Sequence, residues 1–85
     1  MYDEISDFNV VDRLSFIKFL ELLRKDLAVN SEYWENKTLD DFLEALSRYT
    51  EDIQALYDNT GQQINADEPS WNVFADIFKS ARIYE

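Results

Sequence analysis

The sequence predicts an all-α fold: a compact three-helix domain, with helices over about 12–29, 38–59 and 70–83 and an N-terminal segment folded over them. Gly and Pro each occur once, at Gly61 and Pro69, so few residues interrupt a helix. Apolar side chains recur at helical spacing in each range. With 85 residues, 46% of them hydrophobic and 15% aromatic, the chain suits one core and is too apolar for disorder. Residues 1–85 are therefore read as a single helical domain.

The first helix is predicted to begin after Asp12, an N-cap residue, and to end before Asn30 and Ser31. One face carries an apolar arc formed by Phe16, Phe19, Leu20, Leu23 and Leu27. Leu14 and Leu22 fall outside this arc, so the helix has a second apolar face. Two interpretations remain open for that face. Either the N-terminal segment, which contains Tyr2, Ile5, Phe8, Val10 and Val11, covers it, or a second copy of the chain does.

The second helix is the most clearly marked, because Thr38 supplies a hydroxyl cap and Gly61 suits the left-handed turn that follows a helix end. The third helix is predicted to be capped by Ser70 or Asp67 and to close the core with one apolar face. That face is formed by Trp71, Phe74, Ala75, Ile77, Phe78 and Ala81.

Composition excludes several function classes. The chain has 18 acidic and 8 basic residues, no Cys and no His, and a formal charge of −10. This charge disfavours nucleic acid and anionic membranes as partners and favours a basic protein. Without Cys or His the sequence contains no common metal or nucleophile motif, so we predict no metal site, no cofactor and no enzymatic activity. The lack of a secretion signal predicts a cytoplasmic protein.

Carboxylates gather on the polar side of the second predicted helix, where Arg48 is the one base between them. Arg48 is placed four residues from both Glu44 and Asp52, so it can bridge two turns. Two interpretations apply to the remaining charge: a solvated surface, or a docking face for a basic partner. The candidate partner-binding residues are Asp40, Asp41, Glu44, Glu51 and Asp52.

Two further features lie near the chain end and in the first loop. Tyr33 and Trp34 are predicted to plug the open end of the bundle, in preference to serving as exposed anchors. Arg82 falls within the apolar arc of the last helix, where its guanidinium can stack on a ring or pair with Glu35 or Glu85. A calcium loop beginning at Asp58 fails, because Gly61 stands at the fourth position and an EF-hand needs Gly at the sixth.

The segments "YWENKTLDDFLEAL" and "PSWNVFADIFKSARIYE" resemble a family of small uncharacterised bacterial proteins with Trp-Glu-Asn-x-Thr-Leu-x-x-Phe-Leu and Pro-Ser-Trp-x-x-Phe-Ala motifs. The resemblance implies a free-standing helical protein of bacterial origin and carries no known activity. Some shared positions are polar and are not required by packing. We expect them to link the Trp34 loop to the chain end as a polar cluster, formed by Glu35, Asn36, Arg82 and Glu85.

The function predicted from these observations is a non-catalytic protein-interaction or inhibitor module, similar in kind to an immunity protein or antitoxin, that binds a basic partner. One alternative is a structural homodimer formed through the surplus apolar face around Leu14 and Leu22. A second alternative is a small-ligand module, which requires a pocket lined by Trp34 and Trp71.

Overall fold

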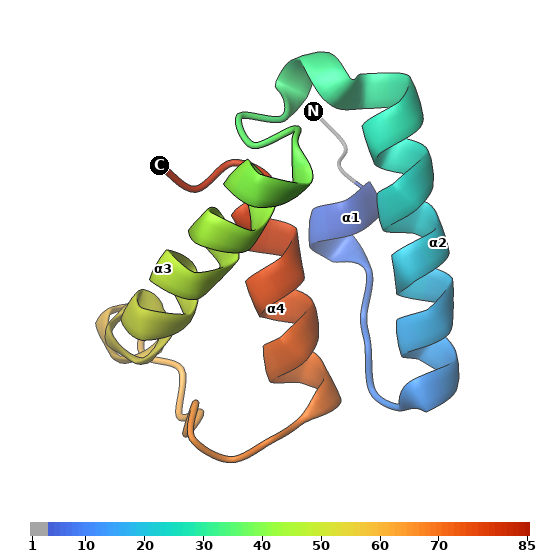
Figure 1. Ribbon diagram of the computed structural model, residues 1–85. Coiled ribbons are helices and arrows are strands. Elements are labelled where there is room, and N and C mark those ends of the chain that lie inside the picture. Colours follow the sequence, from blue (N-terminus) through green and yellow to red (C-terminus); the bar gives the residue numbers. More distant parts are fainter. Residues whose placement is uncertain (1–3) are drawn as a thin grey trace.

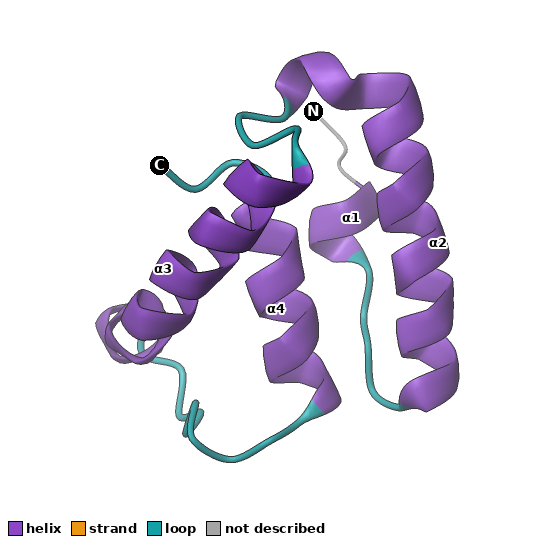
Figure 2. Cartoon of the chain, viewed as in Figure 1, coloured by secondary structure: helices purple, strands orange, loops and turns teal. Residues whose placement is uncertain are grey.

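The computed structural model describes residues 4–85 as helices and loops, with no strand in this range (Figure 2). The elements are α1 (Glu4–Asp7), α2 (Arg13–Asn30), a 3-10 turn η1 (Ser31–Tyr33), α3 (Leu39–Asn59) and α4 (Trp71–Ala81). The predicted all-α class is therefore confirmed. The predicted third helix, 70–83, ends earlier than expected, because the carbonyl of Arg82 accepts hydrogen bonds from the loop amides of Glu35 and Asn36.

Each long helix begins at the predicted cap. The Asp12 carboxylate accepts a 2.8 Å hydrogen bond from the amide of Ser15, whose hydroxyl in turn accepts one from the Asp12 amide. Thr38 and Ser70 cap α3 and α4 in the same way, each accepting from the amide three residues later. After α3, Gly61 has φ +73°, the left-handed conformation predicted for that position. These local signals were sufficient to place the starts of the three long helices and the end of α3.

Helices α3 and α4 pack through rows of side chains spaced four residues apart on both helices. The row on α3 includes the buried residues Ala45, Ile53 and Tyr57, and the row on α4 includes Val73 and Ala81. Rows of this spacing on both partners give an oblique helix crossing, which Figure 1 shows for α3 over α4. Small residues at one end of each row, Ala45 and Ala81, are fully buried and let the backbones approach.

The N-terminal segment folds over α2, as the sequence predicted. Ile5 of α1 and Val10 are 2% and 1% exposed and join Phe19 in one buried cluster. Leu22 is partly buried against this cluster, so one part of the surplus apolar face of α2 is covered from within the chain. Tyr2, which the prediction included in this segment, lies outside the described residues.

The predicted apolar arc of α2 requires correction at its edges. Leu20 and Leu27 are 37% and 36% exposed, although helical spacing placed them in the apolar arc. The physical reason is that α2 is splayed away from α3, which therefore does not cover them (Figure 1). Leu14 stays 62% exposed, and Val11 is 66% exposed despite belonging to the predicted cover. The side of α2 that faces away from α4 and α1 therefore carries uncovered apolar groups.

A series of aromatic contacts joins α2 to α3 and α4. Ring centroids lie 5.8 Å apart for Trp34 and Phe42, 6.2 Å for Phe42 and Phe78, and 5.9 Å for Phe78 and Phe16. These rings come in turn from the loop between α2 and α3, which we call the first loop, and from α3, α4 and α2. Aromatic pairs at such distances add about 0.5–1.5 kcal/mol each beyond the area they bury, so this series holds α2 to the α3–α4 pair.

Candidate functional site

The predicted partner-binding carboxylates lie along the outer side of α3. We call this surface the acidic face of α3, formed by Asp40, Asp41, Glu44, Glu51 and Asp52. All of them are exposed. Asp40, Glu44 and Asp52 follow one row of the helix at four-residue spacing, with Arg48 completing it. The side chains are therefore available to a partner without any rearrangement of the core.

Arg48 does not bridge both of its predicted partners. Its Nε lies 3.6 Å from Oε1 of Glu44, an ion pair without a hydrogen bond, and its Nη1 donates a 2.6 Å hydrogen bond to the backbone carbonyl of Glu85. Asp52 accepts a hydrogen bond from the hydroxyl of Tyr84 instead, and this bond is the main reason that the pKa of Tyr84 is raised. The last two residues, Tyr84 and Glu85, thus lie against the middle of α3, beside Arg48 and Asp52.

The predicted polar cluster is partly assembled, and backbone groups supply most of its bonds. Nδ2 of Asn36 donates to the carbonyls of Ala81 and Tyr84, at 2.9 and 2.8 Å. The amides of Glu35 and Asn36 donate to the carbonyl of Arg82, at 2.9 and 3.1 Å. The first loop therefore caps the end of α4 by satisfying carbonyls that the helix leaves without partners. The side chains of Glu35 and Glu85 are exposed and take no part in these bonds.

Arg82 pairs with Asp26 of α2 instead of the two carboxylates considered from the sequence. Arg82 is 6% exposed, and its Nη1 lies 3.2 Å from Oδ2 of Asp26. The same carboxylate accepts a 2.8 Å hydrogen bond from the indole nitrogen of Trp34 and a 3.0 Å bond from Nδ2 of Asn30. Trp34 is 5% exposed, as the plug interpretation predicted, whereas Tyr33 is 61% exposed.

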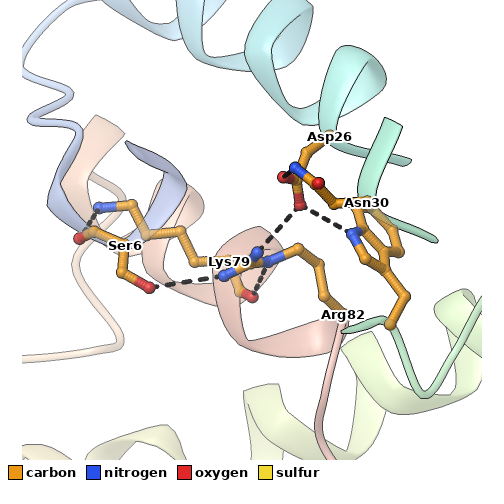
Figure 3. Close-up of polar contacts among 6 residues, drawn as sticks. Ser6, Asp26, Asn30, Lys79 and Arg82 are labelled. Atoms are coloured by element: carbon orange, nitrogen blue, oxygen red, sulfur yellow. Dashed lines mark hydrogen bonds and ion pairs between the residues drawn. The ribbon is translucent and has the colours of Figure 1, made fainter. Parts of the chain in front are cut away.

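Asp26 is the central residue that sequence reasoning missed. We call the residues around it the Asp26 network, formed by Asp26, Asn30, Trp34, Lys79 and Arg82 (Figure 3). Nε of Arg82 donates to the Lys79 carbonyl at 2.8 Å, and Nζ of Lys79 donates to the Phe8 carbonyl at 2.7 Å. The network therefore connects the N-terminal segment, α2, the first loop and α4. A signal was present, because Asp26 falls on the core side of α2, three residues after Leu23.

Across residues 4–85 there is no group of three or more Asp and Glu side chains placed to hold a metal ion. A surface depression lies beyond the end of α3, lined by residues that include Gln54, Asp58 and Gln62, and neither Trp34 nor Trp71 lines it. Gln54 fills a structural role there, because it bonds the carbonyl of Ile64 and the amide of Ala66.

No helix within residues 4–85 is long and apolar enough to cross a membrane. The fold and its surface thus define a small all-α domain with an acidic helix face. The sequence profile of DUF7660, a family of unknown function, matches residues 12–85, and the chain belongs to this family. Both tryptophan segments lie within the matched range, so the predicted resemblance to an uncharacterised family is confirmed. Searches of curated proteins and of solved structures give no significant match.

Proposed function

We propose that the protein is a non-catalytic, cytoplasmic protein-interaction module that binds a basic protein through the acidic face of α3. The observation that carries this proposal is the exposure of Asp40, Asp41, Glu44 and Glu51 on α3, a helix whose one cation is Arg48. In most folded proteins such charges are interspersed with bases, which neutralises the local field. A surface with this excess of carboxylates attracts cations over roughly a Debye length, about 8 Å at physiological salt.

Electrostatic attraction of this kind raises the rate of association and selects partners by charge. Asp40 and Asp41 stand in the first turn of α3, so they also offset the positive end of the helix dipole, and Thr38 caps the same turn. The acidic face therefore rests on a helix whose start is well fixed. A rigid surface loses little conformational entropy on binding, which favours recognition of a basic protein of matching shape.

The test is a pull-down from lysate of the source organism with the purified protein as bait. The variant Asp40→Asn, Asp41→Asn, Glu44→Gln, Glu51→Gln keeps the shape of the face and removes its charge. Asp52 stays unchanged, because it accepts the Tyr84 hydroxyl. We expect the native bait to retain a basic protein that moderate salt elutes and that the variant does not retain.

A matched control removes the same amount of charge elsewhere. The variant Glu4→Gln, Asp7→Asn, Glu32→Gln, Glu68→Gln changes exposed carboxylates off α3 and, like the test variant, removes four charges from −10. The control should retain the partner, because the proposal depends on the position of the charge. Equal loss of the partner in both variants, or binding that is indifferent to salt, would contradict the proposal.

A further inference from the structure

The outer side of α2 combines exposed apolar groups with exposed cations. We call it the basic face of α2, formed by Leu14, Ile17, Lys18, Arg24 and Lys25. Leu14 and Ile17 are 62% and 47% exposed, and all three cations are exposed. Leu14, Lys18 and Lys25 follow helical spacing of four and seven residues, and Ile17 and Arg24 are likewise seven apart, so all of them point away from the buried side that carries Phe19 and Leu23.

These cations are not used to hold the fold together. Within residues 4–85, Lys18 and Lys25 form no ion pair, and Arg24 approaches only Glu21, at 3.9 Å with both side chains more than 70% exposed. Lys79 and Arg82, in contrast, are engaged with internal carbonyls and with Asp26. The basic face of α2 therefore holds charge and apolar area that the isolated chain does not use.

The acidic face of α3 has the complementary composition. Leu39 and Leu43 are 73% and 51% exposed, and Asp40, Glu44 and Glu51 lie beside them on the helix. Each surface is thus a helix with two exposed aliphatic groups and an excess of one charge: three cations with one acid, Glu21, on α2, and carboxylates with one base, Arg48, on α3. Opposite charges around matched apolar centres are what suppresses wrong partners and fixes register in protein interfaces.

Helices α3 and α2 lie on opposite sides of the molecule, with α4 and α1 between them (Figure 1), and both surfaces consist of exposed residues of these helices. A single chain therefore cannot bring them together. Two copies can do so only head to tail, because surfaces on opposite sides of a molecule cannot both contact the same second copy. Contacts of this type leave a free face at each end and so extend beyond a dimer unless the rotation closes a ring.

We propose that the basic partner of the acidic face of α3 is the basic face of α2 on a second copy of this chain, which gives head-to-tail self-association. This inference rests on the proposed function for the binding surface, the acidic face of α3, but its partner is a basic patch on an acidic chain in place of a basic protein. The net charge of −10 repels like copies at long range, but salt screens this repulsion beyond about 8 Å at physiological ionic strength. Contact pairs and apolar groups act inside that distance, so association should be weak and dependent on concentration.

The test uses two variants that each block one face. Lys18→Gln with Arg24→Gln removes charge from the basic face, and Asp40→Asn with Glu51→Gln removes it from the acidic face. All four positions are exposed, so both variants should keep the circular dichroism spectrum and melting temperature of the native chain. If either fails this check, the single changes Leu14→Ser and Leu43→Ser on the same two faces replace them.

Sedimentation of the native chain should show species of at least twice the 10.1 kDa mass that grow with concentration. Each variant alone should remain a monomer. An equimolar mixture should form a dimer and nothing larger, because only one intact pair of faces is available. A native chain that stays monomeric, a variant that still associates alone, or a mixture without the dimer would overturn the inference. Capture of a foreign basic protein in the pull-down would then still support the proposed function.

Discussion

Removal of the Asp26 carboxylate should destabilise the protein more than any change to its surface charges. The variant Asp26→Ala leaves the guanidinium of Arg82 and the indole N–H of Trp34, both buried residues, without their shared acceptor. Breaking a buried ion pair by deleting one partner costs about 3–5 kcal/mol. Arg82 keeps its bonds to Lys79 and Ser6, which places the expected loss near the lower end of that range.

This loss is large compared with the whole stability of the fold. At roughly 0.05–0.15 kcal/mol per residue, a chain of 85 residues has a free energy of unfolding of about 4–13 kcal/mol. Urea unfolding monitored by circular dichroism measures the change directly. Asp26→Asn keeps one acceptor oxygen and should lose less, about 1.5–3 kcal/mol, the worth of a hydrogen bond to a charged group.

Glu21 provides a control on the same helix. It also pairs with an arginine, but the distance to Arg24 is 3.9 Å and both side chains are exposed. Exposed pairs contribute about 0–1 kcal/mol, so Glu21→Ala should leave stability almost unchanged. If Asp26→Ala loses no more than Glu21→Ala, the Asp26 network does not hold the four segments together and the reasoning fails.

Three further predictions concern other polar contacts. Asn36→Ala removes the hydrogen bonds to the carbonyls of Ala81 and Tyr84 and should cost about 1–3 kcal/mol in urea unfolding, with faster amide exchange after residue 81. Burial and the bond to Asp76 raise the pKa of Tyr57, so the unfolded chain ionises first and stability should fall as pH rises above about 10. Tyr57→Phe should show a smaller alkaline loss in the same titration. The amide and hydroxyl of Ser15 lower the pKa of Asp12, so its cap stabilises α2 above about pH 4 and is lost as pH falls through the lower native pKa. The difference in stability between the native chain and Asp12→Ala should therefore shrink on acidification.

Local signals in the sequence were enough to predict most of the fold. Asp12, Thr38, Ser70 and Gly61 each act on neighbours within a few residues, so their roles follow from spacing alone. The same holds for the apolar rows of α3 and α4, because their helical spacing identifies the buried side of each helix. The prediction that Leu20 belongs to the covered arc of α2 was wrong. How much of a helix is covered depends on the angle at which it meets its neighbours, and spacing along the chain does not give that angle.

The partner of Arg82 was not predicted, since spacing along the chain says nothing of an ion pair across 56 positions. Glu35 and Glu85 were considered because they are near Arg82 through the shared motif or along the chain. Asp26 interrupts the buried side of α2, and a buried acid requires a partner. Arg82 interrupts the apolar arc of α4 in the same way. Two opposite charges on buried helix sides, Asp26 and Arg82, therefore predict an ion pair with each other.

The distribution of cations separates stability from binding in this chain. Lys79 and Arg82 lie within the fold and bond to carbonyls or to Asp26, so their positions are constrained by packing. Lys18 and Lys25 lie on the outer side of α2 without ion pairs among the described residues, so packing does not require them to be charged. Changes at the first pair should therefore alter stability, and changes at the second should alter association while the fold persists. If the two effects cannot be separated in this way, α2 is not an independent binding surface.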